Sequence, residues 1–103
     1  MKLTDLEPHW LSDHVFVFRC PHCRKTWLSC KTAPISIKEQ FEIFRAADIE
    51  PAGPKYGVVP MGEKYTWKLK DGNRDFASMS VTPSIDASAA GHWHGHITKG
   101  EIK

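Results

Sequence analysis

The chain of 103 residues has few cysteines, little net charge and no long apolar run, and each shortage excludes a class of protein. Three cysteines are too few for a disulfide-held secreted scaffold, and their odd number leaves one unpaired, so we expect a cytoplasmic protein with reduced thiols. The longest apolar stretch, 15–18, is far too short to span a bilayer, and the first residues contain no signal peptide. A net charge of +2 argues against a dedicated polyanion binder.

Histidine and tryptophan are abundant by comparison. The chain has six histidines and four tryptophans, and its cysteines and histidines are clustered in the sequence. Its length suits one domain, so we expect residues 1–103 to form a single zinc-binding domain, held together by the clustered residues.

The pattern of apolar residues predicts a β-rich α+β domain, made of antiparallel hairpins with one helix. A helix is expected at 37–47, because Ser36 and Glu39 form a capping box at its start. Prolines and glycines predict an irregular loop at 51–62, and small residues predict a connection at 83–91. The expected strands are 14–20, 25–31, 64–70, 76–82 and 92–98, followed by a turn at 99–100 and a short strand around Ile102.

The strongest chemical signal is the pair Cys20 and Cys23, because two thiolates on a tight turn can both reach one zinc ion. A second C-x-x-C is absent, so the other ligands must come from His92, His94 and His96. Strand positions four apart are separated by roughly 13 Å, which excludes His92 with His96 and leads us to choose His92 with His94. His96 is left as a group that supports the site or faces solvent, although it could replace a ligand, and the reserve ligands are Cys30, His22 and His14.

The predicted metal is one structural zinc ion that staples the two ends of the chain together. A domain of this size is stable by only about 5–15 kcal/mol, whereas structural zinc contributes roughly 10–16 kcal/mol in small peptides. Catalysis is not favoured, because the histidines stand in no H-E-x-x-H or H-x-E frame and the nearest acids in sequence are Asp86 and Glu101. We therefore expect a binding or adaptor module that acts on an unidentified protein partner.

A redox function is the first alternative. The sequence C-P-H-C at 20–23 is similar to the active site of thiol-disulfide oxidoreductases of the thioredoxin superfamily, and 81–83 is similar to the segment that contains their cis-proline. In that fold the first cysteine opens a long helix, whose dipole favours the thiolate. Residues 24–33 are poor helix formers, and Pro34 ends them.

Nucleic-acid binding is the second alternative. Lys64, Lys68 and Lys70 alternate along the expected strand 64–70, with Tyr65 and Trp67 on the opposite, inward face. Lysines could contact phosphates and exposed aromatic rings could stack on bases. A solvated strand face over a core tryptophan explains the same pattern more simply.

Most of the chain also resembles a family of small uncharacterised bacterial and phage proteins. Family members carry an early cysteine pair, a tryptophan strand, and the motifs P-S-I, W-H-G and N-G. The matching segments here are Cys20 and Cys23, Trp67, 81–85, 91–95 and 97–101. Many members have a further cysteine before W-H-G where this chain has Gly91 and His92, and Lys99 replaces the usual asparagine. The resemblance implies a metal-binding domain, plausibly phage-encoded, without an established reaction.

Overall fold

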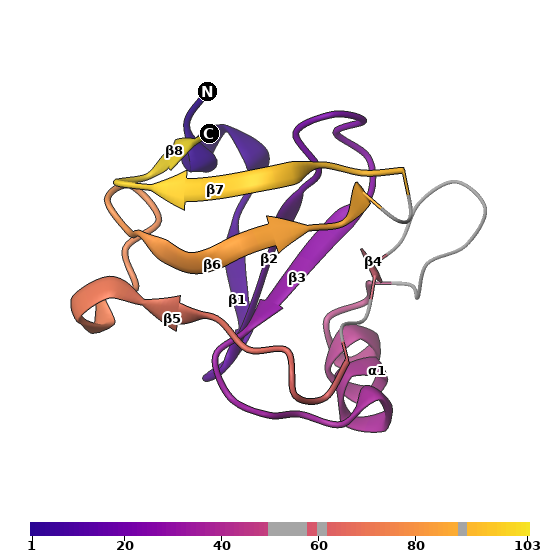
Figure 1. The fold of residues 1–103 in the computed structure, drawn as a ribbon. Helices are drawn as coiled ribbons and strands as arrows, with labels where there is room; N and C mark the ends of the chain where they lie inside the picture. The colour runs from indigo at the N-terminus through magenta and orange to yellow at the C-terminus, as the bar shows by residue number, and fades with distance from the viewer. Residues whose placement is uncertain (50–57, 60–61, 89–90) are drawn as a thin grey trace.

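The computed structural model describes residues 1–49, 58–59, 62–88 and 91–103, and these residues form two sheets and one helix (Figure 1). The fold is α+β and β-rich, as the sequence predicts. All strand pairs are antiparallel except β3 with β4, which is parallel. The first sheet contains β1 (His9–Ser12), β2 (Val15–Arg19), β3 (Trp27–Lys31) and β4 (Val58–Val59), in that order. The second contains β5 (Lys68–Leu69), β6 (Val81–Asp86), β7 (His94–Thr98) and β8 (Glu101–Ile102).

Strand β2 lies in the middle of the molecule and is buried on both faces. Phe16 and Phe18 enter the core between the two sheets, whereas Val15 and Val17 face a smaller cluster under helix α1 (Ile37–Ala46). Apolar side chains therefore occupy both faces, which explains why the sequence of β2 does not alternate. The result is a three-layer order of helix, first sheet and second sheet.

The expected hairpin and helix are confirmed. Strands β2 and β3 pair antiparallel from Val15↔Lys31 to Arg19↔Trp27, so the residues between them form the hairpin tip. Helix α1 begins after Ser36, whose hydroxyl accepts a hydrogen bond from the Glu39 amide at 3.1 Å. This bond satisfies one of the amides that have no partner inside the helix.

The strand expected at 64–70 is shorter, since only Lys68–Leu69 pairs as β5. Trp67 is buried as expected, but Tyr65 is 64% exposed, so its predicted inward orientation is wrong. The buried Lys31 ammonium binds the carbonyl oxygens of Gly62 and Tyr65, which holds this segment in a turn. A lysine from another strand thus overrides the local alternation.

The strand expected at 76–82 is also displaced, because β6 runs from Val81 to Asp86 and includes Pro83. Side chains of Asn73 and Asp75 accept hydrogen bonds from the amides of Asp75 and Ala77, and these local turns compete with a strand. An irregularity in the β6–β7 register between Val81 and Ile85 accommodates the proline, which follows a cis peptide bond.

Four short elements were not expected. They are the 3₁₀ helices η1 (Leu3–Leu6) and η2 (Lys70–Gly72), strand β1, and strand β4, which interrupts the predicted loop at 51–62. The rest of that loop, apart from Gly62, lies outside the described residues. Within the described part of the chain, no helix is long and apolar enough to cross a membrane.

Candidate metal centre

The tip of the β2–β3 hairpin presents two cysteines on one tight turn. Cys20 directly follows β2, and its amide donates to the Thr26 carbonyl at 2.8 Å. The Arg24 amide donates to the Cys20 carbonyl at 2.8 Å and closes the turn. Arg24 has a φ of 57°, a left-handed conformation that reverses the chain directly after Cys23.

His92 reaches this tip from the second sheet, just before β7. Its amide donates to the Ala87 carbonyl at 3.0 Å, and the Ala87 amide donates to the Trp93 carbonyl at 3.0 Å. These two bonds fix the backbone of His92 against the end of β6. In Figure 1 the chain entering β7 passes close to the loop between β2 and β3, and the side-chain distances below establish that contact.

Trp93 anchors this junction. Its ring is buried and meets the Phe18 ring edge-on, with centroids 6.0 Å apart. The ring lies over Gly95 so closely that a Cβ at that position would come within 2.4 Å of it. Gly95 is therefore needed for Trp93 to fold back, and Trp93 places His92 beside the hairpin tip.

The ligand atoms of Cys20, Cys23 and His92 all lie within 4.8 Å of one another, although the residues are up to 72 positions apart in sequence. The Cys23 Sγ lies 3.8 Å from the His92 Nδ1. Tetrahedral zinc, with Zn–S of about 2.3 Å and Zn–N of about 2.0 Å, would separate a sulfur and a nitrogen ligand by about 3.5 Å. Two thiols and one imidazole at this spacing suit zinc in both geometry and chemical type.

The three groups differ in exposure, which determines how the site meets solvent. Cys20 is buried, His92 is half-buried and Cys23 is exposed. Burial acts to raise the pKa of Cys23, but hydrogen bonds from the amides of Thr26 and Lys25 outweigh it and lower the pKa to about 6. The thiolate that a metal requires is therefore favoured at neutral pH.

His94, the fourth predicted ligand, does not belong to this close group of described residues. It is exposed on β7 and pairs with Asp86 across the β6–β7 ladder. The sequence argument placed both histidines on one strand face, but His92 precedes the strand, so the two-residue spacing does not apply to it. His94 as a ligand stays a prediction.

The reserve ligands are not part of the close group either. Cys30 is fully buried inside β3, where burial raises the pKa of its thiol. His14 contacts the Thr32 hydroxyl at 3.2 Å, beyond the opposite end of the hairpin. His22 is exposed in the turn, and His96 is exposed further along β7.

Sequence reasoning missed the residues that position the ligands. These are Thr26, whose amide donates to the Cys23 sulfur at 3.4 Å, and the pair Trp93 and Gly95. The sequence shows a tryptophan two residues before a glycine, but this spacing positions a ligand only because the tryptophan ring packs over the glycine. Only the tertiary structure shows that contact.

The chain was also compared with known proteins. No protein-family model, curated protein or solved structure matches it. The argument for function therefore rests on the site itself.

Proposed function

We propose that this chain is a structural zinc-binding module in which one zinc ion, held by Cys20, Cys23 and His92, ties the β2–β3 hairpin to β7. The observation that carries the proposal is the meeting of these three ligand atoms within 4.8 Å, two from the loop between β2 and β3 and one from the segment before β7. His94 is the fourth protein ligand we expect, and it would need to turn toward the tip; a water molecule is the alternative.

A structural role fits the surroundings of the site better than hydrolysis does. Among the described residues no carboxylate joins the Cys20, Cys23 and His92 group. Asp86 accepts hydrogen bonds from the hydroxyl and amide of Ser88, and these bonds lower the pKa of its carboxyl group. A carboxylate with a lowered pKa, held in its own turn, is a poor general base. We propose an adaptor role, in which the ion rigidifies a surface that binds another protein.

Metal analysis of protein purified without a histidine tag tests the site. We expect one equivalent of zinc for the unaltered chain and for Cys30→Ala, and almost none for Cys23→Ser or His92→Gln. His94→Gln should weaken zinc binding if His94 is the fourth ligand, and His96→Gln is its matched control. Less than a tenth of an equivalent in the unaltered protein would refute the zinc proposal.

A thiol redox function is a second candidate, favoured by the exposure and lowered pKa of Cys23. In that reaction the Cys23 thiolate would attack a substrate disulfide and Cys20 would release the product, leaving a Cys20–Cys23 disulfide and two reduced substrate thiols. The segment after Cys23 becomes strand β3, so the helix that supports such thiols in thioredoxin-like folds is absent there. Thiols that stay reduced throughout a glutathione titration of metal-free protein would eliminate this candidate.

A further inference from the structure

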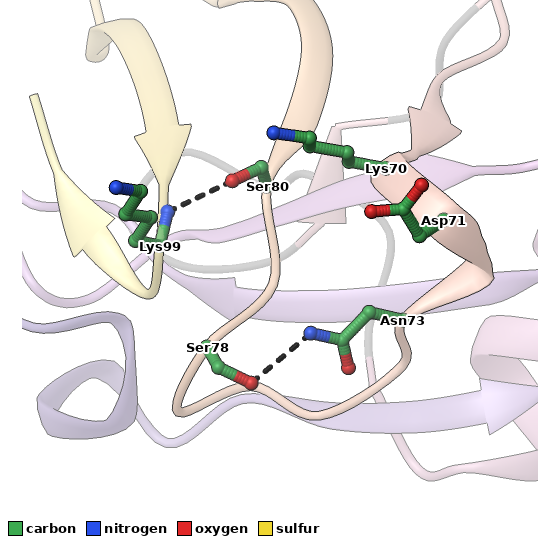
Figure 2. A pocket seen from close by; sticks show the side chains of 6 residues that line it. All are labelled: Lys70, Asp71, Asn73, Ser78, Ser80 and Lys99. Carbon is green, nitrogen blue, oxygen red and sulfur yellow. Dashed lines mark hydrogen bonds between the residues drawn. The ribbon is translucent and has the colours of Figure 1, made fainter.

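A polar hollow of about 260 Å³ lies in the second sheet, built from segments other than the hairpin tip that carries Cys20 and Cys23. It is bordered by the 3₁₀ helix η2 (Lys70–Gly72), by the segment that leads into β6, and by the β7–β8 turn. We call it the donor hollow, and Figure 2 shows the side chains that line it. They are Lys70, Asp71, Asn73, Ser78, Ser80 and Lys99.

The backbone around the donor hollow is fixed by hydrogen bonds between its walls. The Lys70 amide donates to the Ser80 carbonyl at 2.9 Å, and the Gly100 amide donates to the Met79 carbonyl at 2.8 Å. Gly100 has a φ of 75°, and a Cβ there would lie 2.2 Å from the Ala77 carbonyl oxygen. The β7–β8 turn is thus pressed onto the wall that carries Ser78 and Ser80, so the backbone around the donor hollow is held in place before any ligand arrives.

The hydroxyl oxygens of Ser78 and Ser80 each already accept a hydrogen bond, so these groups are set to act toward a ligand as hydrogen-bond donors. The Ser80 Oγ accepts from the Lys99 amide at 2.9 Å, and the Ser78 Oγ accepts from the Asn73 Nδ2 at 3.0 Å (Figure 2). A hydroxyl has one hydrogen to donate. Within the described chain neither hydroxyl donates that hydrogen to a protein acceptor, so both remain available as donors.

The charged residues that line the donor hollow also favour an anionic ligand. Lys70 and Lys99 come from opposite walls of the donor hollow, with Ser80 between them in Figure 2, and neither forms an ion pair with a described residue. The one carboxylate, Asp71, leaves the lining with a net charge of +1. In Figure 2 the Lys70 ammonium lies beside Ser80, whereas that of Lys99 points away from it and has to turn inward to reach a ligand. With Lys99 turned inward, two ammonium groups and two hydroxyl donors would border one space and suit a tetrahedral oxyanion.

We propose that the donor hollow binds a phosphate group, with Lys70 and Lys99 as the charged contacts and Ser78 and Ser80 as hydroxyl donors. The group can belong to a small phosphorylated molecule or to a single-stranded nucleic acid, since both present the same oxygens. This site does not depend on the zinc ion, so either proposal can fail without the other.

Amide chemical shifts in the full-length protein test the site, with inorganic phosphate and a single-stranded oligothymidylate as separate probes. We expect saturable shifts at Ser80 and Lys99. Lys70→Gln and Lys99→Gln should each weaken binding about tenfold, because each removes a charge-assisted hydrogen bond. Lys68→Gln, which removes the same charge two residues from Lys70 but outside the donor hollow, should weaken phosphate binding less than about twofold.

Asp71→Asn is a variant that should strengthen phosphate binding, a result that misfolding could not produce. It removes the repulsive carboxylate, and asparagine tolerates the left-handed φ of 55° at this position, so phosphate binding should tighten severalfold. The probe with the higher affinity identifies the source of the phosphate, and an affinity for the oligothymidylate that falls steeply with salt assigns it to a strand. The proposal is overturned if neither probe gives saturable shifts, or if Lys68→Gln weakens binding as much as Lys70→Gln.

Discussion

The two ends of the β2–β3 hairpin are both tied to distant parts of the chain, but by different means. At the tip, Cys20 and Cys23 meet His92 from the second sheet. At the other end, the buried Lys31 ammonium binds the carbonyls of Gly62 and Tyr65. Under the zinc proposal, the first connection requires an ion from solution, whereas the second carries its charge and its hydrogen-bond donors in a side chain.

This difference determines how each connection responds to its surroundings. Burial lowers the pKa of Lys31, while the nearby Cys30 and Glu63 act to raise it again. The carbonyl partners of Lys31 belong to the chain itself, so this connection needs no added component. The tip, by contrast, exposes a sulfur with a lowered pKa, and under the zinc proposal its cohesion depends on the supply of metal and on pH. The proposal thus gives the same pair of strands one connection that needs metal and one that does not.

Removal of metal should have the largest effect on stability. With free zinc a thousandfold above its dissociation constant, the bound ion adds about 4 kcal/mol to the free energy of unfolding. Urea unfolding with and without a chelator measures this difference. Cys23→Ser should unfold at the same urea concentration in both conditions, and a chelator effect that persists in this variant would place the metal elsewhere.

Lys31→Met should have the next largest effect, and the chelator should not change it. The methionine preserves the apolar stem but leaves two carbonyls without their donor, which costs about 2–3 kcal/mol. The variant should still bind one equivalent of zinc, because the hairpin tip is at the other end of β3. Loss of zinc in Lys31→Met would show that the two connections are not independent.

Gly95→Ala should weaken the tip indirectly. The added methyl group collides with the Trp93 ring, and overpacking of this kind costs about 2 kcal/mol. Because Trp93 directly follows His92 and holds it beside the hairpin tip, the zinc affinity should fall together with the stability. Gly72→Ala is a control in which the added methyl group meets nothing within 4 Å, although the φ of 67° strains the backbone; it should lower the stability without changing the zinc affinity.

The smallest effect concerns the thiols of metal-free protein. Thiolates are the reactive form, so alkylation of Cys23 should accelerate as pH rises through about 6, the value to which hydrogen bonding lowers its pKa. Cys30 is fully buried and its pKa is raised, so it should stay unmodified in the folded state. Mass spectrometry after timed alkylation separates the two residues. A Cys23 midpoint near 8.5 would show that the amides of Thr26 and Lys25 do not stabilise the thiolate.

The sequence predicted those parts of the fold that depend on neighbouring residues. The hairpin, the helix start at Ser36 and the β7–β8 turn follow from local patterns, and all three are present. The strand at 64–70 was predicted too long because Lys31, more than thirty residues earlier, fixes the turn at Gly62 and Tyr65. No local pattern contains that contact.

The candidate site was likewise predictable only where it depends on neighbouring residues in the sequence. C-x-x-C on a hairpin tip follows from the sequence, and so does the involvement of the histidine-rich segment. The choice of His92 over its neighbours depends on the packing of the Trp93 ring over Gly95. Strand β7 also begins at His94, two residues later than the sequence pattern suggests. The expected placement of His94 rested on a strand that does not include His92.

Five described residues other than glycine have positive φ angles; two of them line the donor hollow and a third is adjacent to Cys23 in sequence. Arg24 follows Cys23 at the hairpin tip, and Asp71 and Lys99 border the donor hollow. Glycine would be more relaxed at each position, because side chains disfavour this backbone conformation. Substituting glycine at these positions should relieve backbone strain while removing a charged side chain. These three positions therefore offer a way to measure, one residue at a time, how much conformational strain the protein tolerates to keep charge at its sites.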